Sequence, residues 1–118
     1  MARARLLKPG FFSNEELCEL PAFARLLYAG LWTIADRDGR LDDRPKRIKA
    51  EVLPYDRVDV AVLLDKLEEK GFIHRYVVEQ AHFIQIVKFS VHQHPHKNEP
   101  PGVIPAPEPW QGLSLIHI

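Results

Sequence analysis

Apolar residues recur at helical spacing in two stretches of the chain. In residues 21–36 the side chains that share one helical face are Phe23, Leu27, Leu31 and Ile34. Gly30 lies on that face and would let another element approach closely, while Tyr28 and Trp32 sit towards the far side. In residues 57–70, here called the leucine-striped helix, one narrow stripe is formed by Val60, Leu63, Leu64 and Leu67. We expect two helices, the first more buried because it is apolar almost all round.

Short polar residues mark the expected beginning of an earlier helix. Ser13 and Glu16 form the S-x-x-E pattern of a capping box, which predicts a short helix over about 14–20. Pro21 follows and can begin the next helix, because a first-turn residue needs no backbone N–H for the helical hydrogen bonds.

Two aspartates are the expected caps in the middle of the chain. Asp43 would be the N-cap of a helix over 44–52, and Pro54 would end it, because the residue before a proline is pushed out of the helical region. Asp56 would cap the leucine-striped helix, and Gly71 would be its left-handed stop. The pattern therefore predicts two helices in succession.

Two β-rich runs follow, FIHRYVV at 72–78 and HFIQIVKF at 82–89, with a short turn between them. They predict a β-hairpin. Apolar residues lie on both faces of the second run: Ile84 and Ile86 on one, and Phe83, Val87 and Phe89 on the other. Both faces should therefore be at least partly covered. A short extended piece is expected earlier, at residues 40–41, after the turn at Gly39.

From His92 onwards the periodic pattern stops. Six prolines fall within residues 92–109, which is typical of a PPII-like or disordered linker. The final LSLIHI matches the translation of CTGTCTCTTATACACATC, a transposase end sequence used as an adapter in DNA library preparation. We expect a folded domain over 1–97, a proline-rich linker over 98–112 and an adapter-derived end over 113–118, with the natural C-terminal part missing. A genuine short strand is the alternative for the last six residues.

The order of these elements predicts the fold. It runs short helix, buried helix, extended piece, basic helix, leucine-striped helix and hairpin. This order indicates an α+β, mainly helical fold of the winged helix-turn-helix type, in which a three-helix core carries a β-hairpin wing. An extra short N-terminal helix and a disordered proline-rich C-terminal tail would be added to it.

Composition narrows the classes of protein further. The 118 residues suffice for one domain and a tail. Sixteen Lys and Arg balance sixteen Asp and Glu, which excludes a protein that coats nucleic acid through bulk charge. The single cysteine, Cys18, cannot form an intrachain disulfide, so a reducing, cytoplasmic setting is expected. No apolar run approaches the roughly 20 residues of a membrane span.

Positive charge is concentrated in the expected helix 44–52. With Ile48 and Val52 facing the core, the basic side chains lie outward or on the flanks. The outward ones are Lys46 and Arg47, and those on the flanks are Arg44 and Lys49. Clustered cations on an exposed surface suit contact with DNA phosphates. The candidate site comprises these four residues, extended by Arg37 and Arg40 just upstream; the alternative is an ordinary solvated helix face.

The sequence also resembles a known family. The matching stretches are LKPGFFSNEELCELP, ARLLYAGLWTIADRDGRL, RPKRIKAEVLPYD, LLDKLEEKGFI and IQIVKFSVHQHPHKNEPP, which together span residues 6 to about 101. They resemble the N-terminal winged-helix domain of bacteriophage replication proteins of the replisome-organiser or DnaD-like primosome type. The resemblance implies a DNA-binding module at the front of a longer protein in a bacterial host cell. Host replication proteins, such as a helicase or other primosome components, would be partners of its missing part.

The outer face of the leucine-striped helix suggests a different function. In most winged helices the third helix enters the major groove. Here that face shows Val58, Val62, Asp65 and Glu69, and acidic side chains repel phosphate. The two valines could instead meet a protein. A protein–protein adaptor without significant DNA affinity is therefore the alternative function, and a phage transcriptional regulator is a third.

The sequence contains no recognisable catalytic motif and no standard metal-binding motif. There is no Gly-rich phosphate loop and no nucleophile motif, so we expect neither an enzyme nor a cofactor. His92, His94 and His96 alternate, but their spacing matches no closed zinc site. We therefore expect no metal.

Overall fold

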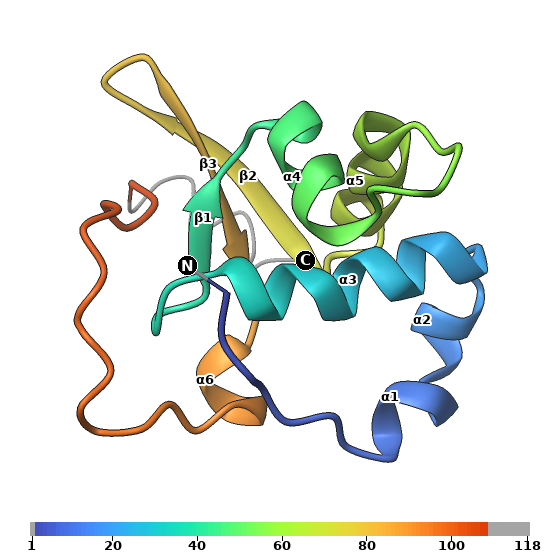
Figure 1. Cartoon of the computed structure of the whole chain (residues 1–118), viewed down its shortest axis with the longest axis horizontal. Coiled ribbons are helices and arrows are strands. Elements are labelled where there is room, and N and C mark those ends of the chain that lie inside the picture. The colour runs from blue at the N-terminus through green and yellow to red at the C-terminus, as the bar shows by residue number, and fades with distance from the viewer. Residues whose placement is uncertain (1, 109–118) are drawn as a thin grey trace.

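The computed structural model describes residues 2–108 of the chain. In that range the chain forms one compact α+β domain with six helices and a three-stranded antiparallel sheet (Figure 1). The helices are α1 (Gly10–Ser13), α2 (Glu15–Cys18), α3 (Ala22–Ile34), α4 (Pro45–Val52), α5 (Val60–Glu69) and α6 (Phe89–His92). The strands are β1 (Arg40–Asp42), β2 (Ile73–Val78) and β3 (Ala81–Ile86). The predicted α+β, mainly helical class is confirmed. No helix in residues 2–108 is long and apolar enough to cross a membrane.

The central element is α3. In Figure 1, α4 and α5 lie on one side of it, and α1, α2 and α6 lie on the other. The approach of α4 is close at Gly30, where an added Cβ would overlap the side chain of Val52. The expectation that Gly30 lets another element approach is therefore confirmed.

The first expected cap is displaced by one residue. Asn14, not Ser13, is the N-cap of α2, and its side chain accepts a hydrogen bond from the backbone N–H of Leu17 at 2.9 Å. Ser13 is instead the last residue of the one-turn α1. Asn caps helices as well as Ser does, so the preceding turn of helix decided which of the two neighbours was used.

Asp43 does not cap α4. The N-cap position is occupied by Arg44, which makes no side-chain cap bond, and Pro45 lies in the first turn. The carboxylate of Asp43 pairs instead with Arg75, with Nε and Oδ2 2.7 Å apart. The Asp43 carboxylate, which the local sequence pattern predicts as the N-cap of α4, is therefore used in a long-range ion pair instead.

The leucine-striped helix begins later than expected. Its N-cap is Asp59 rather than Asp56, and the Asp59 carboxylate accepts from the backbone N–H of Ala61 at 3.1 Å. All four residues of the predicted stripe are buried: Val60, Leu63, Leu64 and Leu67. Gly71 has φ +82°, which confirms it as the left-handed residue beyond the helix.

The buried face of α3 agrees with the expected one at Leu27 and Leu31, which are fully buried, but differs at two other positions. Phe23 is 41% exposed, whereas Tyr28 is only 7% exposed. Phe11 of α1 packs against Trp32 with ring centroids 5.4 Å apart, and Phe72 packs against Tyr28 at 5.2 Å. Because α3 is apolar nearly all round, the positions of these neighbours, rather than its own periodicity, decide which face is buried.

The sheet has the strand order β1-β3-β2. The predicted hairpin is confirmed, with Glu79 and Gln80 both at positive φ in a two-residue turn, and the predicted extended piece forms β1. Ile84 and Ile86 belong to the core that the sheet shares with the helices. Phe83, on the opposite face, is buried as well, so both faces of β3 are covered.

The segment beyond the hairpin packs on the domain instead of forming a disordered tail. Gln93 is 4% exposed, and its side-chain amide exchanges two hydrogen bonds of 2.8 Å with the backbone N–H and C=O of Leu6. Further along, the hydroxyl of Tyr76 donates to the carbonyl of Pro105 at 2.7 Å. Contacts with the domain therefore extend beyond residue 97, where the folded part was expected to end.

Polar contacts explain this difference. Residues 98–105 have no apolar periodicity, and for that reason their sequence predicts disorder. They are held instead by hydrogen bonds and ion pairs to distant residues, which a local pattern does not register. The six residues assigned to an adapter, 113–118, lie outside the described part of the chain.

Candidate functional site

The helix α4 presents basic side chains to the solvent. Ile48 points into the core and is 2% exposed. Lys46 and Arg47 are exposed, as is Arg44 directly before the helix. Among residues 2–108, the side chains of Arg44 and Lys46 make no ion pair or hydrogen bond. The exposure of these three cations follows from the helical periodicity that predicted it.

The other cations of α4 have partners on the same helix. Arg47 Nε lies 3.5 Å from Glu51 Oε1, and the two side chains are 65% and 43% exposed. Such an exposed pair contributes little and exchanges readily for another anion. Lys49 Nζ donates to the carbonyl of Leu53 at 3.2 Å, near the C-terminal end of α4. Lys49 is thus the cation of this helix least free to bind another group.

Arg37 and Arg40 both form hydrogen bonds within the domain, although Arg40 also lines a hollow together with Arg44 and Arg47. Arg37 Nη1 donates to the carbonyl of Glu99 at 2.9 Å. Arg40 Nε donates to Gln85 Oε1 at 2.8 Å, which joins β1 to β3. The turn at Gly39 sends both arginines towards the sheet and the C-terminal segment. The structure therefore divides the six predicted cations into three exposed ones, Arg44, Lys46 and Arg47, and three that donate hydrogen bonds within the domain, Arg37, Arg40 and Lys49.

A further cation, Arg57, lies beside α4 and was missed by the sequence analysis. It is exposed and lines a shallow groove between α4 and the start of α5, together with Lys46 and Lys49. Asp56 and Asp59 line the same groove. Periodicity could not find Arg57, because it lies in the non-helical segment before α5, as a single cation between Asp56 and Asp59.

The outer face of α5 is acidic and partly apolar. Val62 is 45% exposed, and Glu69 is exposed as well. Asp65 is exposed and forms an ion pair with Arg75, with Oδ1 and Nη1 2.6 Å apart. Val58, expected on this face, instead packs partly buried against the core. The exposed surface of this helix therefore offers little positive charge to a phosphate.

Arg75 of the hairpin fixes the start of α4. Its Nε and Nη2 donate to the carboxylate of Asp43 at 2.7 and 3.1 Å, while Nη1 reaches Asp65 on α5. The hydrogen bonding that Arg75 donates to the Asp43 carboxylate is the main reason that the pKa of Arg75 is raised. This arginine is therefore committed within the domain and orients α4 relative to α5 and the sheet.

No arrangement typical of a metal site is present in residues 2–108, where no three His, Cys, Asp or Glu side chains gather closely enough to hold an ion. His96 Nδ1 accepts from the backbone N–H of Asn98 at 3.0 Å.

No protein-family model, curated protein or solved structure matches the chain. The function is therefore argued from the geometry of the domain.

Proposed function

We propose that this chain is a winged helix-turn-helix module that binds DNA through α4. The order of its elements supports this fold: α3, then β1, then α4 and α5, then the β2–β3 hairpin. The strand β1 pairs with β3, and the hairpin extends beyond the helices as a wing would (Figure 1). The helices α3, α4 and α5 would be the three-helix core.

The observation that carries the proposal is the set of exposed cations at α4, in a chain of zero net charge. Arg44 and Lys46 have no side-chain partner within residues 2–108, and the pair made by Arg47 is solvent-exposed. All three can turn towards phosphate without breaking a buried interaction. Arg57 adds a fourth cation beside them. Phosphate contacts carry no sequence information, so we expect weak, sequence-tolerant and salt-sensitive binding.

The biological role follows from the resemblance to phage replication proteins. In that role the module holds a replisome organiser or a primosome-like protein on DNA in the cytoplasm of the bacterial host. Host replication proteins would then be recruited by further parts of the longer protein that the resemblance implies.

The test compares two double variants that change net charge equally. Lys46→Glu/Arg47→Glu reverses two cations of α4, and Lys8→Glu/Lys97→Glu reverses two exposed cations elsewhere. With fluorescein-labelled duplex DNA at low salt, the α4 variant should bind about tenfold more weakly or worse. The control should lose far less. Equal losses in both would mean that only bulk charge matters, and the proposed site would be wrong.

The adaptor remains the second candidate, because the outer face of α5 combines an exposed Val62 with acidic side chains. A wild-type protein that binds neither duplex nor single-stranded DNA at low salt would make the adaptor the better proposal.

A further inference from the structure

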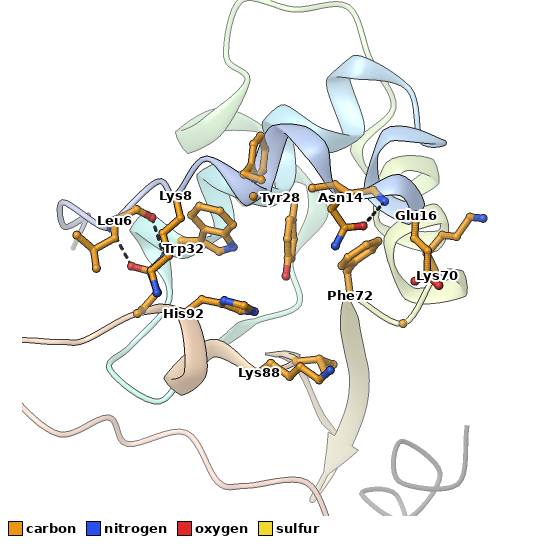
Figure 2. Close-up of a pocket in the computed structure, with 16 residues that line it drawn as sticks. Leu6, Lys8, Asn14, Glu16, Tyr28, Trp32, Lys70, Phe72, Lys88 and His92 are labelled. Carbon is orange, nitrogen blue, oxygen red and sulfur yellow. Dashed lines mark hydrogen bonds between the residues drawn. The ribbon is translucent and has the colours of Figure 1, made fainter.

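A pocket of about 520 Å³ opens between the N-terminal segment with α1 and α2, and the segment that leads into α6 (Figure 2). Much of its wall is aromatic: Phe11, Tyr28, Trp32 and Phe72. Basic side chains line it as well: Lys8, Lys70, Lys88 and His92. An apolar pocket with a few converging polar groups is the usual form of a binding site.

This pocket lies on the side of α3 away from α4. Gly30 faces α4, because a Cβ added there would overlap Val52. Tyr28 and Trp32 are two positions before and after Gly30, which is about 200° around the helix, and both line the pocket. Figure 1 shows the same division, with α4 on one side of α3 and α1 and α6 on the other. DNA held on α4 would therefore face away from the pocket and would not occupy it.

The polar groups offered to an occupant are mainly hydrogen-bond donors, with the carboxylate of Glu16 as the one acidic group in the lining. Lys8 and Lys88 form no side-chain ion pair or hydrogen bond within the described chain, whereas Lys70 is held by Glu19 at 3.1 Å. The hydroxyl of Tyr28 points into the pocket (Figure 2). Burial raises the pKa of Tyr28 to about 12, so the hydroxyl keeps its proton at neutral pH. Two free ammonium groups and a hydroxyl suit an occupant with carboxylates or other anionic acceptors.

The aromatic walls favour an inserted side chain over a stacked nucleobase. Phe11 and Trp32 meet edge-on at an interplanar angle of 83°, and Tyr28 and Trp32 meet at 75°. Base recognition by stacking uses an open ring face, and edge-on contacts occupy such faces. An aliphatic or aromatic side chain can fill the remaining space by contact with ring edges.

The backbone at Lys88 is a separate observation about the same pocket. Its φ is +60°, a left-handed conformation that residues other than glycine rarely adopt. A glycine would relieve that strain, which typically costs about 1 kcal/mol or more. The chain instead carries a lysine, and this lysine lines the pocket without a partner of its own.

We propose that this pocket docks an acidic segment of a partner protein, one that presents an apolar side chain beside carboxylates. The apolar side chain fills the space lined by Trp32 and Phe72, and the carboxylates accept hydrogen bonds from Lys8 and Lys88. Because the pocket and α4 lie on opposite sides of α3, the protein can hold this partner and DNA together.

The probe is a peptide of four aspartates followed by Leu-Phe, labelled with fluorescein at its N-terminus and titrated into the full chain. One comparison peptide has four lysines in place of the aspartates, and another has Ser-Ser in place of Leu-Phe. Fluorescence anisotropy should show binding of the first peptide alone, and added salt should weaken it.

The decisive variant is Lys88→Gly, which removes the ammonium group and suits the left-handed backbone. It should weaken peptide binding about fivefold, as expected for one lost exposed charge contact, without lowering the melting temperature. Lys97→Gly, at an exposed residue outside the pocket, should leave peptide binding unchanged. Lys46→Glu/Arg47→Glu should also bind the peptide normally, which separates this proposal from the one for DNA.

Three results would overturn the proposal. They are equal binding of all three peptides, no binding of the aspartate peptide at its highest soluble concentration, and unchanged affinity in Lys88→Gly. Displacement of the peptide by oligothymidylate together with loss of oligothymidylate binding in Lys88→Gly would assign the pocket to nucleic acid, and would overturn it too.

Discussion

Arg5 and Glu99 lie 94 positions apart in the sequence and form a bidentate ion pair. Arg5 Nη1 and Nη2 donate to the two carboxylate oxygens of Glu99 at 2.8 and 3.0 Å. The side chains are only 5% and 6% exposed. Arg3 approaches the same carboxylate at 3.2 Å, and Arg37 binds the Glu99 carbonyl. This cluster holds the two ends of the described chain together, and it explains why Arg37 is not available at the surface.

Loss of the Glu99 charge should destabilise the domain. In Glu99→Gln the buried guanidinium of Arg5 keeps hydrogen-bonding neighbours but loses its counter-ion, which is costly for a buried charge. One kcal/mol moves the melting temperature of a domain of this size by about 4–8 °C, so we expect a fall of several degrees by calorimetry. Glu108→Gln makes the same chemical change at an exposed residue and should have almost no effect. Equal melting temperatures in the wild type and Glu99→Gln would contradict the role given to this pair.

The same pair should make stability depend on acidity. The hydrogen bonds from Arg5 lower the pKa of Glu99 in the folded protein. The contribution of Glu99 to the free energy of unfolding is therefore fully present above the pKa of a glutamate in the unfolded chain, about 4.3. It is lost as the pH falls through the lower pKa that Glu99 has in the folded protein. Urea denaturation of the wild type and Glu99→Gln at a series of acidic pH values should give free energies of unfolding that converge as the pH falls. A gap that stays constant down to the lowest pH would show that the charge is not responsible.

Gly30→Ala should destabilise the protein although alanine favours helices by about 1 kcal/mol over glycine. The new methyl group would overlap Val52 of α4, and overpacking costs about 1–3 kcal/mol. Gly10→Ala, which meets no atom within 4 Å, is the matched control and should be neutral or slightly stabilising. Adding Val52→Ala to Gly30→Ala should restore part of the loss. Chemical denaturation of the wild type and the three variants checks these signs.

Tyr76→Phe should report whether the C-terminal segment is docked. The substitution removes the hydrogen bond from the Tyr76 hydroxyl to the carbonyl of Pro105, worth about 1 kcal/mol, and leaves the ring in place. In a chain that ends at residue 103 the acceptor is gone while Glu99 remains, so the same substitution should lower the free energy of unfolding much less. The difference between the two costs, measured by urea unfolding, is the contribution of the contact. If Tyr76→Phe has the same effect in both chains, the segment is not docked there in solution.

Periodic apolar residues predicted most elements of this fold. These patterns depend on neighbours in sequence or on one closely packed element. They are the stripe from Val60 to Leu67, Gly30 and the alternation around Ile84. For that reason α4 and the hairpin form where they were expected, and α5 buries the expected stripe although it begins later than predicted. The exposure of Lys46 and Arg47 was predictable for the same reason, since a helix with Ile48 inward must turn them outward.

What the sequence could not predict depends on residues that are distant along the chain. Asp43 is a reasonable cap by its position, but Arg75 reaches it from the hairpin. Arg40 lies just before the basic helix in sequence, but Gln85 binds it across the sheet. The segment after residue 97 resembles a linker, because a single glutamate among prolines gives no local sign of its partner Arg5.

The salt dependence of DNA binding tests the central claim most directly. Affinity for duplex DNA should be measured over a series of salt concentrations for the wild type and for Lys46→Gln/Arg47→Gln, which removes the two charges without adding repulsion. Each phosphate contact contributes about 0.9 to the slope of log affinity against log salt. We predict that the slope of the variant is smaller by about 1.8, while circular dichroism shows an unchanged fold. Parallel lines for the two proteins, or no binding by the wild type at low salt, would contradict the claim that α4 contacts DNA.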